Sequence, residues 1–108
     1  MKNAIPKSVK ICAHWHTVRM CEVLKDDGDD LNGEIYHAKA KINLSQSPAA
    51  SVRVETLWHE ILHSIEAQGG LHLKEDAIRI LAVGVFQVLC DNPEMRRAAL
   101  YTHAAPDC

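Results

Sequence analysis

The residues best suited to chemistry in this chain are five consecutive positions, His59-Glu60-Ile61-Leu62-His63. They have the form H-E-x-x-H, and the residue pattern around them predicts a helix from about Ser47 to Gln68. Positions four apart on a helix share one face, so the imidazoles of His59 and His63 can bind one zinc ion at about 2.0–2.1 Å. Glu60 then lies beside the ion, where its carboxylate can take a proton from a water that attacks a carbonyl. The motif predicts two zinc ligands and a general base.

The predicted helix has an apolar stripe that can hold the motif against a core. At about 100° per residue, the stripe consists of Val54, Leu57, Trp58, Ile61 and Ile65. Both motif histidines lie nearly opposite the centre of this stripe. We therefore expect the stripe to be buried and the histidines to face a cleft. Two surface histidines on an amphipathic helix are the alternative.

A catalytic zinc site needs a third protein ligand, which the motif does not supply. The metzincin form would have a glycine at position 66 and a histidine at position 69, but this chain has Glu66 and Gly69, which excludes that class. The remaining candidates lie at the start of a second predicted helix, which has to pack back on the first. They are Glu75, which we favour, and His72 and Asp76, which stay open as alternatives.

Length and composition indicate one small domain. A chain of 108 residues with 47% hydrophobic and 24% charged residues fits a soluble globular protein with a modest core. The net charge of −2 and the lack of a Lys/Arg patch give no reason to expect a nucleic-acid partner. The N-terminus has no apolar signal segment, no run approaches a membrane span, and the four cysteines form no C-x-x-C pair. We therefore expect a cytoplasmic protein with reduced thiols and no membrane contact.

The first part of the chain, residues 1–46, is expected to contain mainly strands and loops. Short strands are predicted at Val9–Ile11 and Thr17–Cys21, followed by an acidic solvated loop at Lys25–Asp30. The segment Glu34–Leu44 then alternates apolar and polar residues, which predicts a half-buried strand. Zinc peptidases commonly bind the substrate backbone along an edge strand, so this strand is either a peptide-binding edge or a plain structural strand.

The second part, residues 47–103, is expected to be helical. Ser47-Pro48 predicts the start of the motif helix, with the serine as cap, and Gly69-Gly70 predicts its end. The next helix, to about Asp91, is apolar around most of its circumference and is therefore expected to be buried. A third helix runs from Pro93 to about Tyr101. The expected fold is α+β in a single domain, 1–108: a few antiparallel strands followed by about three helices.

A longer set of residues is similar to a known family. The set is Thr56-Leu57-Trp58-His59-Glu60-Ile61-Leu62-His63-Ser64-Ile65, Gly70-Leu71, Leu73, Glu75, Leu81-Ala82 and Asp91-Asn92-Pro93-Glu94. It resembles small phage and prophage proteins grouped with the ImmA/IrrE-like zinc metallopeptidases. The resemblance implies a minimal zincin-like core that holds Zn2+ through His59, His63 and a downstream acid, here Glu75, with Glu60 as the base. Better-studied members carry an acidic ligand at the position of Ala77, where this chain departs from their pattern.

The H-E-x-x-H motif and the family resemblance together predict a zinc-dependent metallopeptidase-like hydrolase that acts on a protein or peptide substrate. The family's suggested role is limited proteolysis of cytoplasmic regulators, such as phage repressors, in a bacterial host cell. The alternative is a zincin-fold interaction module, with a structural metal or none, that acts by binding a partner protein. A chain this short lacks a second lobe to wall a deep substrate cleft, which favours the alternative.

Overall fold

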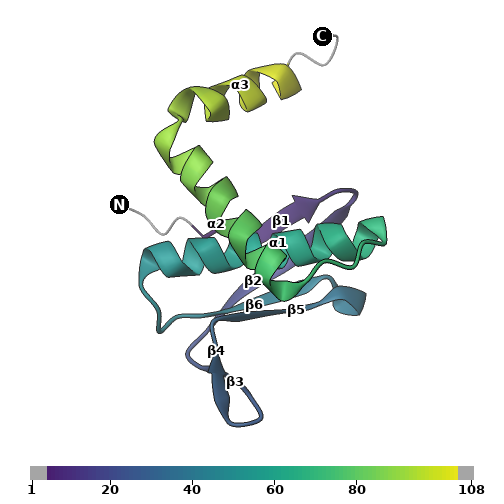
Figure 1. The fold of residues 1–108 in the computed structure, drawn as a ribbon, viewed down its shortest axis with the longest axis vertical. Helices are drawn as coiled ribbons and strands as arrows, with labels where there is room; N and C mark the ends of the chain where they lie inside the picture. The colour runs from purple at the N-terminus through teal and green to yellow at the C-terminus, as the bar shows by residue number, and fades with distance from the viewer. Residues whose placement is uncertain (1–4, 105–108) are drawn as a thin grey trace.

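The computed structural model describes residues 5–104 and has the predicted α+β architecture, with the strands followed by three helices (Figure 1). The strands are β1 (Ser8–Ile11), β2 (His14–Cys21), β3 (Leu24–Asp26), β4 (Asp29–Leu31), β5 (Gly33–Tyr36) and β6 (Lys41–Ser45). A short 3-10 turn, η1 (His37–Lys39), precedes β6. The helices are α1 (Ala50–Gly69), α2 (Glu75–Asp91) and α3 (Pro93–Ala104).

The main sheet is mixed: two of its strand pairs are antiparallel, as predicted, and one is parallel. Its order is β1-β2-β6-β5, with β1/β2 and β5/β6 antiparallel and β2/β6 parallel. Between β2 and β6 the chain leaves the sheet as the β3–β4 hairpin and returns in β5, so β6 runs in the same direction as β2. This order places β5 at an edge of the sheet, with β6 as its one neighbour.

The predicted single strand over Glu34–Leu44 was also wrong. The chain reverses through η1, and Ala40 adopts a left-handed backbone with φ 49° while its N–H donates to the carbonyl of His37 at 3.1 Å. The alanines that continued the alternating pattern therefore belong to a turn. As a result the segment forms two strands, β5 and β6, which pair antiparallel with Glu34 opposite Asn43.

The acidic segment at Lys25–Asp30 is a two-stranded hairpin rather than a loop. β3 and β4 pair around Gly28, whose φ of 84° suits a glycine in a tight turn. The hairpin extends away from the main sheet (Figure 1), and an exposed ion pair joins Lys25 Nζ to Asp30 Oδ1 at 2.7 Å. It takes no part in the site described below.

Helix α1 packs against the sheet over a core formed by both. The core cluster consists of Ile11, Val18, Ile42, Leu44 and Leu57. Close approach between α1 and β5 depends on Gly33, where a Cβ would lie 2.6 Å from Cγ2 of Thr56. Thr56 is itself held by a hydrogen bond from Oγ1 to the carbonyl of Val52 at 2.7 Å.

The two ends of α1 differ in how well they were predicted. Gly70 ends the helix in the left-handed region at φ 71°, as predicted, and the N–H of Leu71 donates to the carbonyl of Glu66 at 2.9 Å. The predicted serine cap was wrong, because α1 begins at Ala50 without a side-chain cap. The Ser47 hydroxyl instead lies 3.0 Å from that of Ser45.

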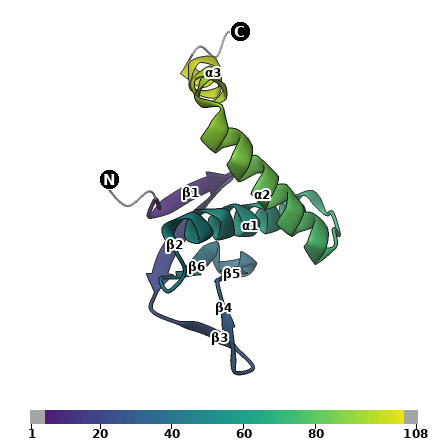
Figure 2. The same ribbon diagram turned by 60° about the vertical axis from the view of Figure 1, so that its left-hand side comes forward.

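Helix α2 crosses α1 and is buried on one side alone, so the prediction of a buried helix was wrong (Figure 2). Its buried residues are Ile78 and Ala82, whereas Ile80 is 66% exposed. α3 continues from the far end of α2, away from the sheet (Figure 1). Among residues 5–104, none of the helices combines the length and apolar character needed to cross a membrane.

The described cysteines Cys12, Cys21 and Cys90 are free thiols. Cys108 and the first four residues, which the sequence analysis also used, lie outside the described part of the chain.

Candidate metal centre

Two helices bring three potential ligands together. α1 carries His59 and His63 one turn apart, and the reversal at Gly70 allows α2 to begin with Glu75 beside them. The Nε2 atoms of the two histidines lie 3.1 Å apart. Oε1 of Glu75 lies 2.5 Å from Nε2 of His59, and Oε2 lies 3.1 Å from Nε2 of His63. The ligand atoms of all three residues lie within 4.8 Å of one another.

The three residues could hold a metal ion, and zinc is one that their atoms suit. Tetrahedral zinc with bonds of about 2.0–2.1 Å separates neighbouring ligand atoms by roughly 3.3 Å. Two of the three distances, at 3.1 Å, are close to this value, whereas the 2.5 Å between His59 and Glu75 is shorter and would have to lengthen around an ion. Two imidazoles and one glutamate are also a ligand set that catalytic zinc sites use. The side chains of His59 and His63 are 20% and 23% exposed and that of Glu75 is 66% exposed. An ion held there would be accessible from solvent.

The other two candidates for the third ligand have different surroundings. Oδ1 of Asp76 forms an ion pair with the guanidinium of Arg79 at 2.9 Å. His72 is an exposed residue of the loop before α2, beside the hollow that also contains His63. Among the residues described, the potential metal-binding group contains neither of them.

Glu66 supports the group in a way that sequence reasoning missed. Its Oε1 lies 3.1 Å from Nδ1 of His63, and its Oε2 accepts the backbone N–H of Leu73 at 2.5 Å. The bond from Leu73, and secondly that from His63, hold the pKa of the Glu66 carboxyl below its usual value. A carboxylate on Nδ1 orients the ring so that Nε2 can face a metal. Glu66 thus fixes both a ligand and the loop that leads to Glu75; its spacing of three residues from His63 was the available signal.

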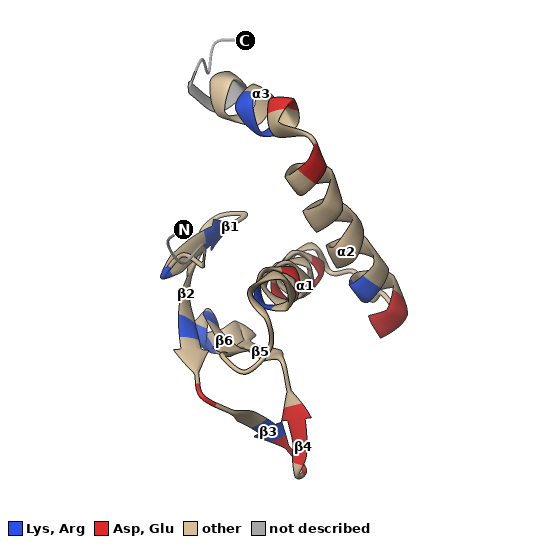
Figure 3. Ribbon diagram, turned by 90° about the vertical axis from the view of Figure 1, so that its left-hand side faces the viewer, with Lys and Arg blue, Asp and Glu red and all other residues tan. Residues whose placement is uncertain are grey.

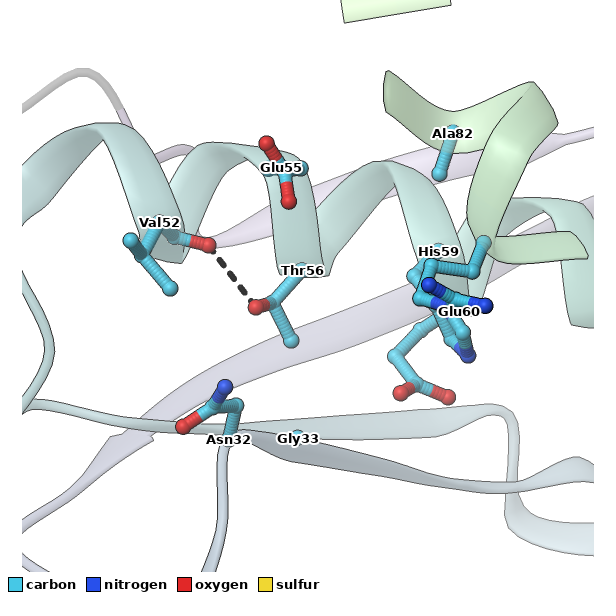
Figure 4. Close-up of a pocket in the computed structure, with 9 residues that line it drawn as sticks. Asn32, Gly33, Val52, Glu55, Thr56, His59, Glu60 and Ala82 are labelled. Carbon is cyan, nitrogen blue, oxygen red and sulfur yellow. Dashed lines mark hydrogen bonds between the residues drawn. The ribbon is translucent and has the colours of Figure 1, made fainter. Parts of the chain in front are cut away.

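Glu60 is buried between α1 and β5 (Figure 4), with 6% of its surface exposed. Burial raises the pKa of its carboxyl from 4.5 to about 7; the nearby His63 opposes this, while Glu75 and Glu34 add to it. The buried positions of α1 are Leu57, Glu60 and Ser64. Of the predicted stripe, Leu57 is therefore buried as expected and Ile61 packs against the core, whereas the last member, Ile65, is 41% exposed.

A buried polar network fixes the rotation of α1 on the sheet. The Ser64 hydroxyl lies 3.1 Å from Nε2 of His16 on β2, and both residues are almost completely buried. Gln68 donates to Ser64 Oγ at 3.0 Å and to the carbonyl of Ile11 at 3.1 Å. These bonds tie α1 to the β1–β2 hairpin. The opposite side of α1, which carries His59 and His63, is thereby held toward α2.

Two hollows flank the metal-binding group. One has a volume of about 260 Å³ and adjoins His59 and Glu60, with walls from β5, α1 and α2 (Figure 4); Gly33, Thr56 and Arg79 are among its lining residues. The other, of about 360 Å³, lies on the side of His63 and is lined by η1 and the loop before α2. The candidate ligands therefore lie between two open spaces beside the edge of the sheet.

Comparison with known proteins finds no matching family model, no similar curated protein and no similar solved structure. The resemblance to the ImmA/IrrE-like group therefore rests on the residues quoted above and remains a prediction.

The assignment of Glu75 can be tested against its neighbour. Glu75→Ala removes a carboxylate that contacts both histidines, so zinc affinity should fall. The loss should be at least about 10-fold, because removing a residue that merely supports a ligand already costs that much. Asp76→Ala is the matched control, since this acid pairs with Arg79 instead. Zinc titration against a competing chelator measures both variants. A larger loss in Asp76→Ala than in Glu75→Ala would move the ligand to Asp76.

Burial of Glu60 should make the metal-free protein less stable at high pH. Because the folded state keeps this proton up to about pH 7, and the unfolded chain loses it near 4.5, the folded state binds more protons within this window. The free energy of unfolding therefore falls as the pH rises through it, by about 3 kcal/mol in total. Glu60→Gln has no proton to lose in this range. The free energy of unfolding of the variant should therefore rise relative to that of the wild type as the pH rises. Denaturant unfolding without metal, from about pH 4 to about pH 8, measures the difference; a constant difference would contradict the burial effect.

Proposed function

We propose that the protein is a zinc-dependent metallopeptidase-like hydrolase. One observation carries this proposal: two imidazole nitrogens and a carboxylate converge within 4.8 Å, and the residue after the first histidine is a buried carboxyl group. His59, His63 and Glu75 would hold the ion. Zinc in such a site polarises a substrate carbonyl and lowers the pKa of a water to about 7.

Glu60 has the role of general base. Its carboxylate accepts a proton from the attacking water and delivers that proton to the amine that leaves. A base is most effective when its pKa lies near the working pH, and burial already raises the pKa of Glu60 to about 7 in the protein without metal. Glu60 has no hydrogen-bond donor among the described contacts that would hold it permanently ionised.

An extended peptide is the substrate that the surroundings favour. β5 lies at the edge of the sheet, and its first residue, Gly33, lines the hollow beside Glu60. A peptide could add to this edge as a further strand, with its side chains entering the hollows on either side of the metal group. The two hollows and the strand edge between them are open to solvent, so a flexible segment of a protein is the substrate that suits them best. We therefore favour limited proteolysis of a cytoplasmic regulator, the role that the family resemblance implies.

A protein-interaction module is the second candidate. It is supported by the openness of the groove and by the exposed apolar side chains of α2 and α3, which include Ile80, Leu100 and Tyr101. In this case the metal has a structural role or is absent, and Glu60 has no chemical task. The two candidates make different predictions for the loss of the Glu60 carboxyl group.

The test is the cleavage of a peptide library derived from bacterial proteins by the zinc-loaded protein, with products identified by mass spectrometry. Glu60→Gln keeps the size of the side chain but cannot act as a base, so cleavage should slow by at least about 100-fold. Zinc binding should be unchanged, because Glu60 is not a ligand. The double variant His59→Ala/His63→Ala is the control that should lose both zinc and cleavage.

The outcome separates the two candidates. Cleavage that depends on Glu60 while zinc is retained supports the hydrolase. Zinc binding by a wild type that cleaves nothing, or that cleaves as fast as Glu60→Gln, would reject the hydrolase and leave the interaction module.

A further inference from the structure

A third hollow lies near the end of α1, and neither the metal-binding group nor the proposed reaction uses it. It has a volume of about 440 Å³ and is bounded by the start of β2, by η1 and by the last turns of α1. Trp15, which is 63% exposed, lines it. We call it the Trp15 hollow. It is larger than either of the hollows that flank the candidate ligands.

The Trp15 hollow adjoins the hollow of about 360 Å³, because His37 of η1 and Ala67 of α1 line both of them. The hollow of about 260 Å³ lies on the other side of the candidate metal centre. The α1 residues that line the three hollows extend from Val52 to Gly70. Figure 3, which looks nearly along α1, shows the sheet on one side of this helix and α2 on another. The hollows therefore form a row along α1 that includes the candidate metal centre.

The length of this row suits an extended peptide. Between Val52 and Gly70 the helix axis rises about 27 Å, at about 1.5 Å per residue, which matches roughly eight residues of an extended chain at about 3.3 Å each. Gln68, which lines the Trp15 hollow, lies little more than one helical turn after His63. A peptide that is bound along β5 and cut at the metal therefore reaches the Trp15 hollow about two to three residues from the cleaved bond.

The lining of the Trp15 hollow suits an uncharged aromatic side chain. Its walls include the indole ring of Trp15 and three alanines, Ala38, Ala40 and Ala67, whose short side chains leave the space open. Within residues 5–104, no aspartate, glutamate, lysine or arginine lines it; its polar groups are imidazoles, a hydroxyl and an amide. Apolar walls with a few polar groups are typical of binding sites, and an exposed indole packs favourably against a second aromatic ring.

The base of the Trp15 hollow is already fixed. His16 and Ser64 both line it, are almost completely buried and lie in a hydrogen bond of 3.1 Å with each other. Ala40 holds a left-handed backbone at φ 49°, a conformation that costs free energy and is found often at binding sites. A side chain that enters the hollow therefore meets walls that need little reorganisation, which favours binding.

We infer that the Trp15 hollow binds an aromatic side chain of the peptide that lies along β5. The aromatic residue is about two to three positions from the cleaved bond, on the side of His63; this register rests on the proposed hydrolase function. Binding of the ring in the hollow depends on Trp15 and not on the metal. Trp15 thus determines specificity and takes no part in the chemical step.

The first test measures binding without catalysis. Acetyl-phenylalanine amide is added at about 1–10 mM to the full chain without metal, and the indole N–H signal of Trp15 is followed by NMR. The chain has two tryptophans, so the signal is identified by its absence from the spectrum of Trp15→Phe. It should move with acetyl-phenylalanine amide and stay in place with acetyl-alanine amide, because alanine has no ring to pack on the indole.

Ala67→Phe fills the wall that the Trp15 hollow shares with its neighbour, so it should weaken this binding. Ala67 is exposed on α1, and the variant should therefore keep the fold, as judged by circular dichroism. Ala98→Phe is the matched control, since this alanine is exposed on α3 and lines none of the three hollows.

The second test uses peptides that the zinc-loaded protein cleaves, with phenylalanine or alanine placed at each position near the cleaved bond. One position on one side of the bond should prefer phenylalanine by about 10-fold in kcat/KM. Trp15→Ala and Ala67→Phe should abolish this preference, whereas Trp15→Phe and Ala98→Phe should keep most of it.

The outcomes separate this inference from the hydrolase proposal. An indole signal of Trp15 that does not move, or cleavage with a preference that is absent or that survives both Trp15→Ala and Ala67→Phe, would overturn the inference and leave the hydrolase standing. A ring that binds at Trp15 in a protein that cleaves no peptide would support the hollow and reject the hydrolase alone.

Discussion

The rotation of α1 about its axis is the constraint on which the candidate site depends. One side of this helix is held to the β1–β2 hairpin by the hydrogen bond between Ser64 Oγ and Nε2 of His16, and by the bond that Gln68 donates to the carbonyl of Ile11. A helix fixed on one side has its other sides fixed as well, because side-chain directions repeat every 3.6 residues. His59 and His63 consequently face the start of α2, and a small rotation would separate them from the carboxylate.

The same rotation of α1 buries the carboxyl group of Glu60 beside the three candidate ligands. This burial is energetically unfavourable in a protein without metal. Desolvation opposes the charge on Glu60, and two imidazoles face each other at 3.1 Å with Glu75 alongside. A divalent cation would attract these carboxylates and bind both nitrogens. Binding of the metal would therefore add to the folding free energy, as it does at many zinc sites. Glu66, which fixes His63 and the loop before α2, reduces the disorder that binding would have to remove.

What could be predicted from the sequence was local. The spacing of His59 and His63 and the place of Glu75 at a helix start follow from helical geometry and from one reversal at Gly70. The parallel pairing of β2 with β6 depends on contacts far apart in the chain, and the turn at Ala40 has no strong sequence signal because alanine rarely takes this conformation. The burial of α2 was overestimated: its apolar circumference favours a covered helix, but one side of it packs against α1 while Ile80 on the other is 66% exposed.

The central claim is that His59, His63 and Glu75 bind one zinc ion. X-ray absorption at the zinc edge of the purified, zinc-loaded protein tests it most directly, because the spectrum separates nitrogen and oxygen ligands from sulfur. The account predicts two imidazole nitrogens at about 2.0–2.1 Å, oxygen at a similar distance and no sulfur shell. A sulfur shell near about 2.3 Å, or a spectrum unchanged when both histidines are replaced by alanine, would contradict the claim and place the metal elsewhere.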